Sequence, residues 1–171
     1  MGISVVLCSH LICSKRKGCA MKKIVLMIML LGVLFVCAGC GSKTVMTNET
    51  FCSTLEDKGF VVQDTTAQYT DFAGIDTASV AVSPDGYQIE FLVCSDVGVA
   101  TSMFNQNKNA FEAEKPDSGG STASVSGSNY DQYTRTCNGL YYHIGRTDNT
   151  LLYVRAPKEY EKDIEQILSD F

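Results

Sequence analysis

The sequence is poor in the residues and motifs on which much enzyme chemistry depends. It has no tryptophan, three prolines and two histidines in 171 residues. From residue 40 onward, G-x-S-x-G, S-x-x-K and H-E-x-x-H are all absent, as is a glycine loop that could cradle phosphate. His143 is the only histidine in that part, and no C-x-x-C occurs there, so we expect no metal site and no cofactor. An enzyme is not expected.

The sequence also lacks an apolar run long enough to cross a membrane. Its longest run, residues 24–37, falls short of the roughly 20 residues that a spanning helix needs, but it has the length of a secretory apolar region. Met21, Lys22 and Lys23 precede it, and Cys-Ala-Gly-Cys at residues 37–40 follows. Small residues before a cysteine allow a signal peptidase to hold the backbone extended. We therefore expect residues 21–39 to be a signal peptide and Cys40 to be lipidated; the alternative is an uncleaved N-terminal anchor.

A complete signal peptide beginning at Met21 leaves residues 1–20 without a role. We interpret them as an upstream extension of the reading frame, with an unusually long positively charged region as the alternative. Residues 40–46 then form a lipidated tether, and residues 47–171 form one extracytoplasmic domain.

Acidic residues are missing before Cys40, which leaves the exported part strongly acidic. All 19 Asp and Glu follow it, whereas five of the 14 Lys and Arg precede it. A domain without clustered basic residues is unsuited to binding nucleic acid, which requires contacts to phosphates. We expect the membrane to be reached through the lipid on Cys40 rather than through surface charge.

Three amphipathic helices are predicted from capping residues and apolar stripes. Thr47 or Asn48 can cap the first helix, which ends at Gly59. Asp96 can cap the second helix, and Pro157 can take the first position of the third. We expect all three helices to cover the same face of one sheet.

Strands are predicted between these helices. Residues 60–66 form the first, and residues 78–95 form a hairpin that turns at Pro84-Asp85-Gly86. The Ser/Gly-rich residues 114–129 form a loop that can add a short edge strand, and residues 130–156 follow as three antiparallel strands. The order α-β-ββ-α-(β)βββ-α predicts a single two-layer α+β domain built on an antiparallel sheet.

The turn at Asn138-Gly139 predicts the register of the last strands, because a two-residue type I′ turn needs positive φ at both positions. Cys137 then lies opposite Leu140, and Arg135 opposite Tyr142. One face carries the residues that we call the Tyr/Arg face: Tyr133, Arg135, Tyr142, Arg146, Tyr153 and Arg155. The other face carries Tyr141, His143, Leu152, Val154 and Ala156, and we expect it to lie beneath the helices.

Tyrosine and arginine often anchor interfaces, because they combine contact area with directed hydrogen bonds. We therefore take the Tyr/Arg face as the candidate binding face, for an anionic group or a protein partner. The alternative is a solvated face with ordinary cross-strand pairs, Asp131 with Arg146 among them.

Three cysteines follow Cys40, so at most one intramolecular disulfide can form between them. A Cys94–Cys137 disulfide would join the two hairpins, and Cys52 could pair with either. Three reduced cysteines that pack as small apolar groups are the alternative.

Three segments carry a resemblance: "LEDKGF" at residues 55–60, "YQIEF" at 87–91 and "RTDNTLLYV" at 146–154. With the lipobox, the chain resembles the small lipoproteins of unknown function that are common in Gram-positive bacteria. The resemblance implies export, lipid anchoring on the extracytoplasmic face of the cell membrane, and a small α+β domain. We expect a non-catalytic binding or accessory module for a protein partner in the cell envelope; the alternative is a small cell-surface hydrolase.

Overall fold

The computed structural model describes residues 41–116, 119–169 and 171. The expected extension at residues 1–20, the signal peptide at 21–39 and Cys40 lie outside the described residues. The elements run in the order α2 (Asn48–Asp57), β1 (Val61–Asp64), η1 (Thr66–Tyr69), β2 (Ile75–Val82), β3 (Gln88–Cys94), α3 (Val97–Ala113), β4 (Ser121–Ser126), β5 (Tyr130–Cys137), β6 (Leu140–Thr147), β7 (Thr150–Pro157), η2 (Lys158–Tyr160) and α4 (Glu161–Leu168).

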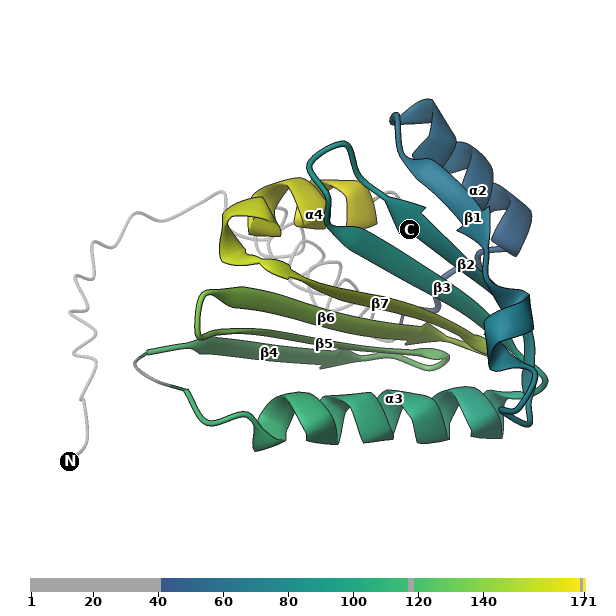
Figure 1. The fold of residues 1–171 in the computed structure, drawn as a ribbon. Coiled ribbons are helices and arrows are strands. Elements are labelled where there is room, and N and C mark those ends of the chain that lie inside the picture. The colour runs from purple at the N-terminus through teal and green to yellow at the C-terminus, as the bar shows by residue number, and fades with distance from the viewer. Residues whose placement is uncertain (1–40, 117–118, 170) are drawn as a thin grey trace, which may run out of the picture. The chain divides into compact units, whose positions relative to one another are not determined.

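One antiparallel seven-stranded sheet forms the centre of this α+β domain, as predicted. Its strand order is β1-β2-β3-β7-β6-β5-β4, so the meander β4–β7 joins the hairpin β2–β3 through the pairing of β3 with β7 (Figure 1). The Ser/Gly-rich segment does supply the edge strand β4, which pairs with β5.

The predicted caps and the predicted hairpin turn are confirmed, whereas Pro157, expected at the first position of the last helix, ends β7, and α4 begins at Glu161. The Thr47 hydroxyl accepts a hydrogen bond from the amide of Thr50 at 3.1 Å, and Asp96 accepts one from the amide of Val99 at 2.9 Å, which caps α2 and α3. Asn138 and Gly139 adopt φ of 52° and 74°, the left-handed conformations that a type I′ turn requires.

The layers differ from the prediction. We expected all three helices on one face, but the structure has α2 and α4 on one face and α3 on the opposite face (Figure 1). Phe51, Leu55 and Ile164 pack with Ile89 and Val154 on the first face. The domain therefore has three layers, because both faces of β3, β6 and β7 carry buried apolar side chains that need a cover.

The opposite core lies under α3. Ala100, Phe104 and Phe111 of α3 pack against a layer of sheet residues that includes Tyr133 and Tyr142. Ile144 and Leu151 complete this layer, and both are almost fully buried. The apolar stripe predicted on this helix thus packs in the core, against the sheet face that we expected to stay open.

Candidate functional site

The predicted register of the Tyr/Arg face is confirmed. Cys137 pairs with Leu140, Arg135 with Tyr142 and Asp131 with Arg146. On the next strand, Tyr142 pairs with Arg155. The six residues of this face do lie on one side of the sheet.

The expectation that this face is open is wrong, because α3 covers it. Tyr133 and Tyr142 are 1% and 0% exposed. The ring of Phe111 on α3 lies 4.8 Å from that of Tyr142, 5.5 Å from Tyr153 and 6.4 Å from Tyr133, measured between centroids. These tyrosines are core residues, and a partner could not reach Tyr133 or Tyr142 without displacing the helix.

The three arginines of this face bind groups of the domain itself. Arg146 is buried and forms an ion pair of 2.6 Å with Asp131. Arg155 is exposed and lies over the ring of Tyr142, 5.7 Å from its centroid. Arg135 donates from its two terminal nitrogens to backbone carbonyls at the end of α3. The Asp131–Arg146 pair of the alternative interpretation is confirmed, but its solvated face is wrong, because α3 covers Tyr133 and Tyr142.

A hollow of about 240 Å³ lies on the opposite face, between α4 and strands β5 and β6. We use "the hollow" for the space lined by Lys43, Gln132, Thr134, Tyr141, His143, Glu165, Leu168 and Ser169. Thr134 pairs with His143 across β5 and β6, and Gln132 pairs with Gly145. The floor is therefore formed by two neighbouring strands, and one wall by the end of α4.

Two buried polar atoms, in side chains that line the hollow, have no hydrogen-bond partner among the described residues. They are the hydroxyl of Tyr141 and Nδ1 of His143, in side chains that are 1% and 6% exposed. A buried polar group without a partner costs about 1–3 kcal/mol. Such groups at the floor of a hollow indicate a place that a polar ligand or ordered water completes.

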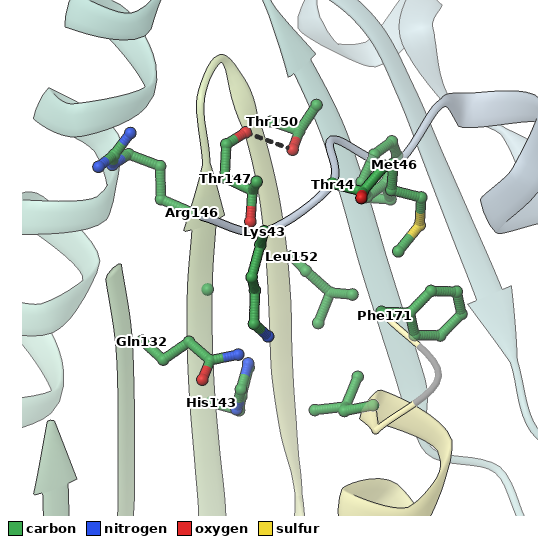
Figure 2. Close-up of a pocket in the computed structure, with 13 residues that line it drawn as sticks. Lys43, Thr44, Met46, Gln132, His143, Arg146, Thr147, Thr150, Leu152 and Phe171 are labelled. Carbon is green, nitrogen blue, oxygen red and sulfur yellow. Dashed lines mark hydrogen bonds between the residues drawn. The ribbon is translucent and has the colours of Figure 1, made fainter. Parts of the chain in front are cut away.

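Gly145 leaves room for the His143 ring. A Cβ atom at this position would approach Nε2 of His143 to 3.1 Å, closer than ordinary van der Waals contact. The imidazole thus lies over the glycine, along the strand. Figure 2 draws the residues around a smaller neighbouring pocket, which shares Lys43, Gln132 and His143 with the hollow, and shows these three side chains beside one another.

The charges along the hollow have opposite signs at its two ends. At one end, burial and then the ammonium of Lys43 lower the pKa of His143 to about 4. At the other end, burial and then the carboxylates of Glu165 and Glu161 raise the pKa of Tyr141. Lys43 and Glu165 line the same hollow but form no ion pair with each other.

The tether brings Lys43 to this place. The side-chain amide of Asn129 accepts a hydrogen bond of 3.0 Å from the Lys43 amide and donates one of 2.9 Å to its carbonyl oxygen. The ammonium group of Lys43 also lies 5.5 Å from the ring centroid of Tyr130. The backbone of residue 43 is thus bound to the loop between β4 and β5, although 86 positions separate the two residues.

The cysteines take no part in the hollow. Cys137 lies in the core under α3, on the face opposite to His143, as the register predicted. The proposed Cys94–Cys137 disulfide is wrong: Cys52, Cys94 and Cys137 are all free. Cys94 lies on β3 and Cys137 on β5, with β7 and β6 between them, so the two strands are roughly 14 Å apart, beyond the reach of a disulfide.

The described residues offer neither a membrane-spanning helix nor a cluster of metal ligands. None of the helices in residues 41–116, 119–169 and 171 combines the length and the apolar character needed to cross a bilayer. In the same residues, no group of three or more His, Cys, Asp or Glu is placed to hold a metal ion.

No protein-family model, curated protein or solved structure matches this chain.

Sequence reasoning placed Tyr141 and His143 on a common face but missed the hollow. The alternation along residues 140–147 predicts that both point the same way, and we took this face as the floor beneath the helices. What the pattern could not show is that α4 leaves part of β5 and β6 uncovered, or that the tether returns to the same place. A histidine and a tyrosine two positions apart on an otherwise apolar face were the available signal.

Proposed function

We propose that the chain is a lipoprotein, anchored through Cys40 to the extracytoplasmic face of the cell membrane, whose domain is a non-catalytic binding module. Its ligand enters the hollow floored by Tyr141 and His143. The observation that carries this proposal is the pair of buried polar atoms without partners, because a ligand that satisfies both recovers the cost of burying them.

The ionisation of the floor favours binding over catalysis. A general acid or base works best when its pKa lies near the working pH. The pKa of His143 is lowered to about 4 and that of Tyr141 is raised, so both side chains are neutral at pH 7. At pH 7 these two side chains can therefore form hydrogen bonds with a ligand, but they are poorly suited to transfer protons as a general acid or base. The alternative of a cell-surface hydrolase has no activated nucleophile to support it among the residues that line the hollow.

The ligand in this proposal is small. The Tyr/Arg face, where we expected a protein partner, is covered by α3. A volume of about 240 Å³ lies below the range typical of drug-sized ligands, roughly 300–1,000 Å³. We therefore propose a small polar component of the cell envelope as the ligand, in place of a broad protein surface.

The position of Lys43 supports a site close to the membrane. It follows Cys40 by three positions, and an extended chain over that distance spans about 10 Å. Because Asn129 holds the backbone of Lys43, a lipid on Cys40 would keep this end of the domain near the headgroups. A ligand released at the membrane surface would meet the hollow directly.

Two measurements test the proposal. The first is acyl labelling of the full chain and its Cys40→Ser variant: we expect label and signal-peptide removal in the former only.

The second is native mass spectrometry of the protein purified from its own membranes in mild detergent. A bound small molecule should accompany the wild type and be lost in a Tyr141→Phe, His143→Leu double variant that still folds. Labelling that survives Cys40→Ser would overturn the anchor, and an equal ligand content in both proteins would overturn the site.

A further inference from the structure

We propose that the hollow binds a short zwitterionic peptide of about two residues, with its carboxylate at Lys43 and His143 and its ammonium group at Glu165 and Tyr141. This inference rests on the proposed function, since it names the class of ligand for the same hollow.

The distribution of charge is the first argument. Lys43 and Glu165 are the two charged residues that line the hollow, and they do not neutralise each other by an ion pair. Glu161 lies at the same end as Glu165, since its carboxylate accepts a hydrogen bond of 3.0 Å from Thr136, which pairs with Tyr141. An anion alone would be repelled at the glutamate end and a cation alone at the lysine end. A ligand with both charges meets an opposite charge at each end.

The neutral groups of the floor are the second argument. The Tyr141 hydroxyl and the Nδ1 atom of His143 can each donate or accept a hydrogen bond, and neither has a partner among the described residues. They can complete the coordination of an ammonium and a carboxylate group. Gln132 and Thr134, on the neighbouring strand, add an amide and a hydroxyl that suit a peptide bond between the two charged ends.

The third argument is size. Tyr141 and His143 are two positions apart on one strand, which places their side chains about 7 Å apart. Two residues of extended peptide span about the same length. The volume of about 240 Å³ holds a ligand of this size but not a folded partner.

Isothermal titration calorimetry tests the inference on the acylated protein in detergent micelles. The probes are alanylalanine, its N-acetyl derivative, its C-terminal amide, and the doubly blocked form. We expect alanylalanine to bind, and each singly blocked form to bind at least about tenfold more weakly, since each block removes one charge-assisted interaction.

Two variants assign the ends of the peptide. Lys43→Gln should lose the preference for the free carboxylate and keep the preference for the free ammonium group. Glu165→Gln should do the reverse. Lys108→Gln, on α3 at the other face of the sheet, is the matched control and should change neither preference.

The outcomes separate this inference from the proposed function. Equal binding of the free and blocked peptides, or variants that weaken all four probes alike, would overturn the zwitterion class and leave the hollow as a site for another small molecule. No binding of any probe, together with a native mass spectrum that still shows a ligand lost in the Tyr141/His143 double variant, would also overturn it. An empty native spectrum would overturn the proposed function itself, with water as the only occupant.

Discussion

Arg135 of β5 and Phe111 of α3 are joined by a hydrogen bond of 2.7 Å, from the guanidinium Nη1 to the backbone carbonyl oxygen of Phe111. The second terminal nitrogen donates to the carbonyl oxygen of Glu114 at 2.6 Å. The last carbonyls of a helix lack partners within the helix, and here an arginine from the sheet supplies two donors. Arg135 therefore caps the C-terminus of α3 and holds this helix on the sheet.

Replacing Arg135 with Ala should lower the free energy of unfolding by about 2–3 kcal/mol, because two hydrogen bonds from a charged donor are lost. Urea unfolding followed by circular dichroism measures the change. Arg155→Ala is the matched control: its side chain is exposed over the Tyr142 ring, so we expect a loss of no more than about 1 kcal/mol. Equal losses in the two variants would contradict the capping role.

Asp131→Asn should change how stability depends on pH under acidic conditions. Burial alone would raise the pKa of Asp131, but hydrogen bonds from Ser126 and Arg146 and the charge of Arg146 outweigh it, so the pKa is lowered. The stability from the charged carboxylate is thus fully present above the unfolded pKa of about 4, and is lost as the pH falls through the lower folded value. We expect wild type to lose more stability than Asp131→Asn between pH 5 and the lowest pH at which both fold. Parallel curves of urea midpoint against pH would contradict this.

His143→Gln should weaken the pH dependence of stability between about pH 4 and pH 6.5. The folded pKa of His143 is about 4, below the ordinary value of 6.5, because the buried ring resists protonation. Between these two values the unfolded chain binds a proton that the folded protein does not, so stability falls as the pH falls from about 6.5 to about 4. The wild type should lose up to about 3 kcal/mol more than the variant across this window. Proton NMR of the imidazole, with no titration near pH 6.5 in the folded protein, provides the direct check.

Gly145→Ala should disturb the hollow locally. The new Cβ would lie 3.1 Å from Nε2 of His143, so the ring has to move. We expect a destabilisation of about 1 kcal/mol and displaced His143 resonances in NMR spectra. Gly41→Ala is the control, because no atom lies within 4 Å of a Cβ at that position. Unchanged His143 resonances in Gly145→Ala would show that the ring does not depend on this glycine.

The three described cysteines should react with iodoacetamide in order of their exposure. Cys52 is half-buried, whereas Cys94 and Cys137 are buried. Burial, together with the nearby carboxylates of Asp76 and Asp96, raises the pKa of Cys94 to about 11, so little reactive thiolate is present at pH 8. Brief labelling followed by peptide mapping should find Cys52 modified first, and Cys94 modified only after unfolding in urea. A Cys94–Cys137 disulfide in the mapped protein would contradict the fold.

Much of the sheet could be predicted because its signals are local. The Asn138-Gly139 turn accepts positive φ, and this fixes which residues face each other over all of β5 and β6. Alternation along β6 then separates Tyr142 from Tyr141 and His143. The caps at Thr47 and Asp96 act within three residues of themselves, and for that reason they could be read from the chain.

The assignment of faces could not be predicted in this way. An amphipathic helix needs an apolar surface, and the strands β6 and β7 offer one on both sides, with Ile144 and Leu151 on one and Tyr141 and Val154 on the other. The pattern of the second helix is equally compatible with either side. Because α3 lies on the Tyr/Arg face, Tyr133 and Tyr142 are core residues and Arg135 caps the helix.

By itself the sequence determined the element types, the α+β class and the pairing within each hairpin, because turns, caps and alternation act over a few residues. Only the tertiary structure decided that β3 joins β7, that α3 lies opposite α2 and α4, and that Lys43 meets His143 and Glu165 around one hollow. These contacts join residues far apart in the chain, and each depends on which helices cover each face of the sheet. The candidate site lies where α4 leaves part of β5 and β6 uncovered.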